Sequence, residues 1–200
     1  MTELTNKERK HDQQWWKLFV DGSSTSQRSG AGVMLETPQG ERIQYALRFN
    51  FDASNNEAEC DALLAGIKLA RAAGAKYLEV FSDSQLVVNQ VKGDFEAKEK
   101  RIAQYLDLIR TFCRTFERFE LKRIPRSSNK EVDQLARLAS SLTMIKIRSI
   151  ILLTQEHSEI EEMMKEVLVS TSKPCWKDAI EAYLTTESLP LDKKRPEQYA

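Results

Sequence analysis

The sequence predicts an α/β fold in which a five-stranded mixed sheet is flanked by helices. Three strand-like runs come first and are joined by short links, which favours an antiparallel meander of strands 1 to 3. Two later strand-like runs alternate with helical segments, which favours parallel pairing of strands 4 and 5. Two of these five runs end in an aspartate, so acidic groups are expected together at one edge of the sheet.

The first strand is expected around Leu18–Val20, because aromatic and β-branched residues favour a half-buried strand. Asp21 then stands at its carboxyl end, before the chain breaks into the small residues Gly22–Ser24. Strands two and three are expected at residues 31–35 and 43–49. The sheet therefore begins with a strand that delivers a carboxylate to its edge.

The first helix is expected from about Asn56 to Ala73, since Ser54 and the two asparagines after it provide capping side chains. The later elements follow in alternation: a strand at 77–81, helices up to 91 and at 98–116, a strand at 119–124 and a helix up to 140. A right-handed crossover through the first helix makes the fourth strand a parallel neighbour of the first.

Composition indicates one globular domain with appendages. The chain has 200 residues, of which 41% are hydrophobic, enough to bury a core. Its three cysteines lie far apart, which is typical of a reducing intracellular compartment, cytoplasmic or nuclear, rather than of secretion. No apolar run is long enough to suggest a membrane partner. We expect a disordered lead-in at 1–14, a folded domain at 15–141 and an extension at 142–200.

Charge is uneven along the chain. The formal net charge is zero, so the overall charge does not indicate a nucleic-acid partner. Between Lys98 and Arg137, however, there are eleven Lys and Arg residues against six Asp and Glu residues. This excess either attracts a polyanion or belongs to a solvated helix face, and the sequence leaves both interpretations open.

Three aspartates are candidates for a shared site. Asp21 and Asp83 each end a strand and each precede a small polar residue, so the predicted topology brings them side by side. Asp133 lies in the first turn of the last helix, beside the core stripe that starts at Val132. An ordinary N-terminal acid is an equally good interpretation of Asp133 taken alone.

Glu59 is the fourth candidate. On the first helix it shares a face with Ala62, Leu63 and Gly66, which form a packing stripe, whereas Glu57 and Asp61 point elsewhere. The alternative is that Glu59 only interacts with the helix dipole, a task that its two acidic neighbours could perform without facing the core.

Four carboxylates cannot lie together without cations, because each negative charge raises the pKa of the others. Mg²⁺ prefers oxygen ligands and keeps water and phosphate oxygens in its shell. Two such ions about 4 Å apart can activate a water and stabilise the leaving oxygen of a phosphodiester displacement. The four acids therefore predict a two-metal site for phosphodiester hydrolysis.

The four acidic motifs also carry a family resemblance. The stretches FVDGSS, NNEAE, FSDSQLVV and NKEVDQLA, in this order and spacing, resemble the type 1 ribonuclease H domain over about Trp15 to Ser141. They are most similar to the ribonuclease H-like domain of plant gypsy-type long-terminal-repeat retrotransposon polyproteins. The later stretches CWKDAIEAYL and SLPLDKK resemble the connector before integrase. Reverse transcriptase and integrase regions are therefore expected to flank this domain in a polyprotein.

The resemblance implies a ribonuclease H-like fold and an activity. Family members hydrolyse the RNA strand of RNA–DNA hybrids with two Mg²⁺ or Mn²⁺ ions. The acidic tetrad that binds these ions corresponds to Asp21, Glu59, Asp83 and Asp133. Contacts to the hybrid are implied for Gly22, Ser23, Ser24, Asn55, Asn56 and Gln85. Capping is the alternative role for the two asparagines, and both roles can hold together.

The chain departs from the family pattern in two places. Many bacterial members carry a histidine in the loop before the last acid, where this chain has RIPRSSNK, and Arg126 is the nearest substitute. A phosphate contact or plain surface charge is the alternative role for Arg126. The segment between Gly93 and Lys98 lacks the basic handle of some relatives, so hybrid binding would rest on Lys98, Lys100, Arg101 and the Lys122–Arg126 cluster.

Two other functions remain open from the sequence. The missing histidine and the unusual tail fit a weakly active or inactive ribonuclease H-like module that serves as a nucleic-acid-binding spacer in a polyprotein. A nuclease of the same fold that acts on another nucleic acid is the third possibility.

Overall fold

The computed structural model describes residues 14–25, 28–140 and 150–171. The expected lead-in (apart from Gln14) and the connector-like stretches after residue 171 lie outside these residues. The chain divides into two compact units, with the boundary between Glu161 and Glu162. The first unit carries the sheet and the site.

The elements follow one another as strands β1–β3, then alternating helices and strands. Their bounds are β1 Trp15–Ser24, β2 Ser29–Glu36, β3 Arg42–Phe49, α2 Asn55–Ala72, β4 Tyr77–Ser82, α3 Gln85–Lys92, α4 Lys100–Cys113, β5 Arg118–Arg123, a 3-10 turn Arg126–Ser128, α5 Lys130–Ser140, β6 Ile150–Gln155 and α6 Glu159–Thr171. The elements predicted between residues 15 and 140 are all present, with ends that differ by a few residues.

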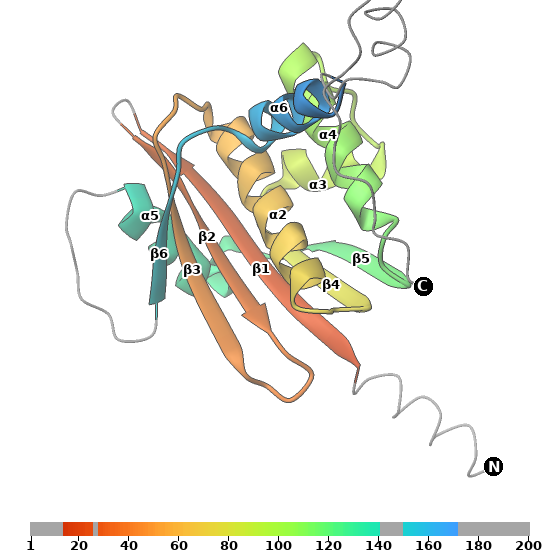
Figure 1. Cartoon of the computed structure of the whole chain (residues 1–200). Coiled ribbons are helices and arrows are strands. Elements are labelled where there is room, and N and C mark those ends of the chain that lie inside the picture. Colours follow the sequence, from red (N-terminus) through yellow and green to blue (C-terminus); the bar gives the residue numbers. More distant parts are fainter. Residues whose placement is uncertain (1–13, 26–27, 141–149, 172–200) are drawn as a thin grey trace, which may run out of the picture. The chain divides into compact units, whose positions relative to one another are not determined.

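The sheet is mixed, as predicted, and its strand order is β5-β4-β1-β2-β3-β6. Strands β1, β2 and β3 pair antiparallel, whereas β4 is parallel to both β1 and β5. Helix α2 packs on β1 and against α4, while α5 covers β1, β2 and β3 from the other side of the sheet (Figure 1). The expected α/β fold, a mixed sheet between helices, is confirmed.

The prediction of five strands was wrong, because the sheet of the described chain has six. Strand β6 pairs parallel with β3, from Gln44↔Ile150 to Phe49↔Gln155. The run Ile150–Leu153 is apolar, but its pairing with β3 depends on residues about a hundred positions away. A strand that adds to a sheet edge over such a separation has no local signal beyond its apolar composition.

Strand β1 is longer than predicted and does not stop at Asp21. It continues to Ser24, and Asp21 pairs with Gly32 of β2. Its parallel pairing with β4, however, ends at Phe19↔Phe81. Asp21 therefore lies just beyond the last β1–β4 pair. It reaches this edge because β4 stops pairing there, and not because β1 ends as the sequence predicts.

Two glycines let helices approach this edge closely. A Cβ on Gly22 would lie 2.3 Å from the Glu59 nitrogen in α2, and a Cβ on Gly32 would lie 2.1 Å from the Val132 oxygen in α5. Real side chains do not fit at such distances, so both positions require glycine. The backbones of α2 and α5 thereby reach opposite faces of β1 and β2 next to Asp21.

Candidate active site

Three carboxylates converge at the edge of the sheet where β1 and β4 separate. Asp21, Glu59 and Asp83 each offer an oxygen, and these oxygens all lie within 4.8 Å of one another. Asp21 is 3% exposed and Glu59 is 7% exposed, while Asp83 is partly exposed. Three of the four predicted acids are thus brought together, and from the elements that the sequence predicts.

Neighbouring groups fix the orientation of two of these acids. The Gly22 backbone N–H donates to Glu59 Oε2 at 3.1 Å. Asn129, in the turn before α5, donates through its amide to the Val20 carbonyl at 3.0 Å and to Asp83 Oδ1 at 3.3 Å. The amide oxygen of Asn129 is buried and has no hydrogen-bond partner in the described part of the chain.

Asn129 is a site residue that sequence reasoning missed. Its position before the last helix indicates a cap, and Arg126 is the residue of this loop that the family pattern points to. In the structure the side chain is 1% exposed and links the ends of β1 and β4. A buried amide next to a cluster of acids is detectable only when the tertiary contacts are known.

The triad holds more negative charge than its surroundings compensate. Burial, followed by the charges of Asp83 and Asp133, raises the pKa of Asp21 to about 7. Burial, followed by the charge of Asp21, raises the pKa of Glu59 to about 8, although the Gly22 N–H opposes this rise. A divalent cation bound by these carboxylate oxygens would offset their repulsion. Mg²⁺ and Mn²⁺ prefer oxygen ligands, so the donor set fits either ion.

Asp133 lies near the triad but is held by arginines. Its Oδ1 pairs with Arg126 at 2.8 Å and its Oδ2 pairs with Arg137 at 2.9 Å. Partial burial alone would raise the pKa of Asp133, but these two contacts outweigh burial and lower it. The charge of Asp133 still acts on Asp21, so the fourth acid is close to the triad without joining it.

The predicted substrate-contacting residues lie at the end of β1 and at the starts of α2 and α3. The Ser24 hydroxyl donates to the Ala53 carbonyl at 2.6 Å, which ties the end of β1 to the segment before α2. Asn55 and Asn56 are the first two residues of α2, and Gln85 is the exposed first residue of α3. The capping role belongs to Ser54, whose side chain accepts from the Glu57 N–H, so neither asparagine is the N-cap.

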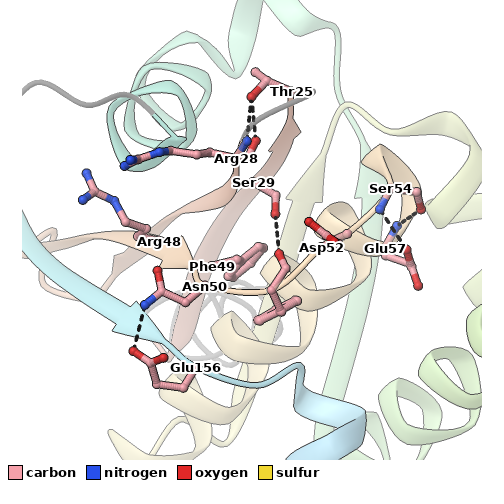
Figure 2. A pocket seen from close by; sticks show the side chains of 12 residues that line it. Thr25, Arg28, Ser29, Arg48, Phe49, Asn50, Asp52, Ser54, Glu57 and Glu156 are labelled. Carbon is pink, nitrogen blue, oxygen red and sulfur yellow. Dashed lines mark hydrogen bonds between the residues drawn. The ribbon is translucent and has the colours of Figure 1, made fainter.

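A pocket of about 880 Å³ opens beside the same N-terminus (Figure 2). Arg28 and Arg48 line one side of it, and Ser54 and Glu57 line the other. The triad is not part of this pocket. Arg28, which directly precedes β2, and Arg48 on β3 are two cations that lie outside the basic 98–137 stretch.

The part of the chain with described coordinates contains no helix of the length and apolar character needed to cross a membrane. Cys60 and Cys113 are both free thiols.

Comparison with known proteins identifies related sequences over the region of the sheet and triad. The model of the family described as "Reverse transcriptase-like" matches residues 19–139. Ribonuclease HI of Halobacterium salinarum is 32% identical over 84 residues, which cover 42% of this chain and 42% of that protein. The match thus spans less than half the length of this relative. A putative hydrolase, EbsB of Enterococcus faecalis, is 28% identical over 127 residues, or 92% of its length.

Solved structures share the fold. The crystal structure of RNase H1 from Halobacterium salinarum superposes with a TM-score of 0.60 at 26% identity, covering 62% of this chain and 96% of that one. LC11-RNase H1 in complex with an RNA/DNA hybrid has a TM-score of 0.57 at 23% identity over 62% of this chain, and supports the fold alone. A foamy virus protease–reverse transcriptase has a TM-score of 0.51 at 16% identity.

Proposed function

Because the chain belongs to the reverse transcriptase-like family, we propose that it is a metal-dependent endoribonuclease that hydrolyses the RNA strand of RNA–DNA hybrids. The observation that carries this proposal is the triad of Asp21, Glu59 and Asp83, whose oxygens lie within 4.8 Å of one another. The similarity to a ribonuclease HI supports the same activity. Asp133 is proposed as the fourth acid of the site.

Each residue of the site has a proposed part. Asp21, Glu59 and Asp83 hold divalent ions, which when bound would supply an activated water and stabilise the leaving oxygen. The buried Asn129 amide keeps Asp83 next to the end of β1. Arg126 is 69% exposed and pairs with Asp133, so it can turn toward a phosphate of the substrate when Asp133 takes another partner.

Substrate binding is proposed for the surface around the α2 N-terminus. Gly22, Ser23 and Ser24 offer backbone and hydroxyl groups at the end of β1, and Asn55, Asn56 and Gln85 offer amides at two helix starts. Amides and hydroxyls at a helix start suit the 2′-hydroxyls and phosphates of an RNA strand.

The finer assignments extend this proposal. We propose that the domain at 15–141 comes from a plant gypsy-type retrotransposon polyprotein and that residues 142–200 connect it to an integrase region. Mg²⁺ is the proposed physiological ion, with Mn²⁺ as a substitute. A reducing compartment, cytoplasmic or nuclear, would keep Cys60 and Cys113 free.

A gel assay on an end-labelled RNA–DNA hybrid tests the function directly. Cleavage of the RNA strand with Mg²⁺, and its loss with EDTA, is the expected result. Double-stranded RNA and single-stranded DNA of the same sequence separate a hybrid-specific enzyme from a nuclease with another substrate. Absence of cleavage on all three, together with absence of Mg²⁺ binding by calorimetry, would indicate an inactive module instead.

A further inference from the structure

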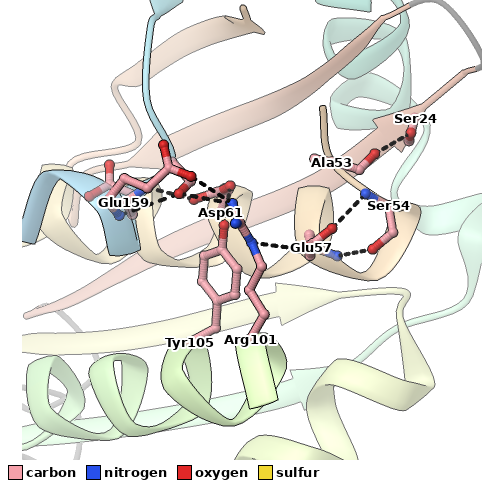
Figure 3. A network of polar contacts seen from close by, with 10 residues as sticks. Ser24, Ala53, Ser54, Glu57, Asp61, Arg101, Tyr105 and Glu159 are labelled. Carbon is pink, nitrogen blue, oxygen red and sulfur yellow. Dashed lines mark hydrogen bonds and ion pairs between the residues drawn. The ribbon is translucent and has the colours of Figure 1, made fainter. Parts of the chain in front are cut away.

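A second polar cluster occupies the face of α2 that turns away from the triad. Glu57 and Asp61 lie one helical turn apart, and they face Arg101 and Tyr105, which lie one turn apart on α4 (Figure 3). Tyr105 donates its hydroxyl to Asp61 Oδ2 at 2.6 Å. Arg101 Nε lies 2.6 Å from Glu57 Oε1 as an ion pair, without the direction of a hydrogen bond.

The turn after β6 and the first turn of α6 close this cluster from a third side. The Glu159 backbone N–H donates to Asp61 Oδ1 at 3.1 Å. Arg101 Nη2 donates to Ser158 Oγ at 3.3 Å and to Glu161 Oε1 at 3.0 Å. Asp61 and Ser158 are fully buried, so these contacts are internal to the domain.

Glu57 connects this cluster to the N-terminus of α2. Its Oε2 accepts from the Ser54 backbone N–H at 2.8 Å, while its own N–H donates to Ser54 Oγ at 3.3 Å. This reciprocal capping box fixes the first helical turn. That turn presents Asn55 and Asn56, and Glu59 follows at once. The two oxygens of the Glu57 carboxylate thus contact the N-cap of α2 and Arg101.

We propose that Arg101 is a positioning residue for the substrate-contacting first turn of α2. Held by Ser158 and Glu161, the Arg101 guanidinium holds Glu57 in the capping box and so orients Asn55 and Asn56. The segment 150–161, which follows the region matched by the family model, is then a working part of the nuclease. This inference rests on the proposed function and replaces the expectation that Arg101 contacts the hybrid.

Three substitutions in the full-length chain test the role of Arg101. Arg101→Met keeps the aliphatic stem and removes the guanidinium, and Arg101→Lys keeps a charge that reaches fewer partners. Glu161→Gln weakens the grip on Arg101 without touching α2 or α4. The matched control is Arg114→Met, because Arg114 is exposed at the opposite end of the same helix.

The first measurement is steady-state cleavage of the labelled hybrid. Arg101→Met is expected to raise KM by roughly three- to tenfold, the loss of about one hydrogen-bonded contact, with kcat within about twofold of wild type. Arg101→Lys should restore part of the loss, Glu161→Gln should raise KM by about twofold, and Arg114→Met should change nothing. A wild-type KM in Arg101→Met overturns the inference, as does an equal rise in the Arg114→Met control.

The second measurement does not need activity. The hydrogen-bonded backbone amides of Ser54, Glu57 and Ala58 are expected to exchange hydrogen about tenfold faster in Arg101→Met than in wild type or Arg114→Met, because the first turn of α2 opens more often. Unchanged exchange overturns the inference whatever the enzyme does. If exchange accelerates but wild-type protein does not cleave the hybrid, the proposed function fails while the positioning of α2 stands. If Arg101→Met does not fold, Glu161→Gln serves for both measurements.

Discussion

Helix α2 presents acids on two faces, and the two sets are treated in opposite ways. On one face, Asp61 receives a tyrosine hydroxyl and a backbone N–H, and Glu57 pairs with Arg101. On the other face, Glu59 receives one backbone N–H and otherwise meets Asp21 and Asp83. The same helix therefore holds one set of carboxylates that the protein satisfies and one set that it leaves with excess negative charge.

The contrast shows what distinguishes a structural acid from a metal ligand. On the α4 side, hydrogen bonds from Tyr105 and Glu159 oppose the effect of burial on Asp61, although burial still raises its pKa to about 7. Buried acids on the β1 side destabilise the protein unless a cation from solution joins them. Acidic composition does not separate these cases, since Glu57, Glu59 and Asp61 lie within five consecutive residues.

The largest expected effect is a loss of cleavage when an acid of the triad is replaced. Asp21→Asn or Asp83→Asn should lower Mg²⁺-dependent hybrid cleavage by about a thousandfold or more, because metal stabilisation of the transition state is worth several kcal/mol. The metal-free protein should melt at a higher temperature, since one repulsive charge is gone. Asp107→Asn, an exposed acid of α4, is the control that should leave both quantities unchanged. Cleavage within tenfold of wild type in Asp21→Asn would rule out the assignment of the triad.

The next effect concerns stability on the α4 side. Asp61→Ala removes the acceptor for the Tyr105 hydroxyl and the Glu159 N–H, so the free energy of unfolding should fall by about 2–4 kcal/mol. Glu59→Gln, on the other face, should leave the metal-free protein as stable or more stable. Urea unfolding at pH 7 without metal measures both. Equal destabilisation by the two variants would remove the distinction between the faces.

A pH titration of stability sharpens the comparison further. The pKa values of Asp21 and Glu59 are raised from 3.8 and 4.5 to about 7 and about 8, so folding favours their protonated forms. The stability they contribute is complete below about pH 4 and is lost as the pH rises to about 8. Asp61, whose pKa burial raises to about 7, adds a slope of the same sign.

Only part of that slope should respond to metal. Saturating Mg²⁺ should flatten the contribution of Asp21 and Glu59, because bound cation replaces the protons, and should leave that of Asp61 in place. Chemical unfolding at several pH values, with Mg²⁺ and with EDTA, gives the two slopes. An Mg²⁺-insensitive slope would mean that the triad does not bind the ion.

The smallest effect is expected at Asp133. Arg137 is 65% exposed and lies one turn from Asp133 on α5, so Arg137→Ala should cost less than about 1 kcal/mol of stability. Since Arg126 still pairs with Asp133, hybrid cleavage should stay within about threefold of wild type. Thermal melting and the cleavage assay together check this. A large loss of activity would show that Arg137 has a role in the site beyond pairing with Asp133.

The fold and the triad could be predicted because their signals are local. Strand-forming runs that end in Asp21 and Asp83 define the sheet edge, and the helical face shared by Glu59 and Ala62 selects Glu59 over Glu57. These patterns need only the period of a helix and the handedness of a crossover. The family motifs reinforce the same residues.

Most of the parts that escaped prediction depend on residues far apart in the sequence. Asp61 does turn away from the Glu59 face, but it points toward α4 and not toward solvent. Its partner there, Tyr105, lies 44 positions later in the sequence, so no local pattern indicates the contact. Asn129 reaches Val20 across 109 positions. Asp133 meets Arg137 one turn later on α5, and the folded turn before α5 brings Arg126 to its other oxygen. Single-residue patterns do not encode which partner a polar side chain finds.

The two tight glycines have a consequence for how the site can change. Gly22 and Gly32 have no side chain, so the backbones of β1 and β2 lie directly against the backbones of α2 and α5 at these two positions. Adding a single methyl at either one would force α2 or α5 outward and carry its acid out of reach. The distance of Glu59 from the other two acids of the triad thus depends on the missing side chain of Gly22, and that of Asp133 on the missing side chain of Gly32. A variant that keeps every carboxylate can still separate them.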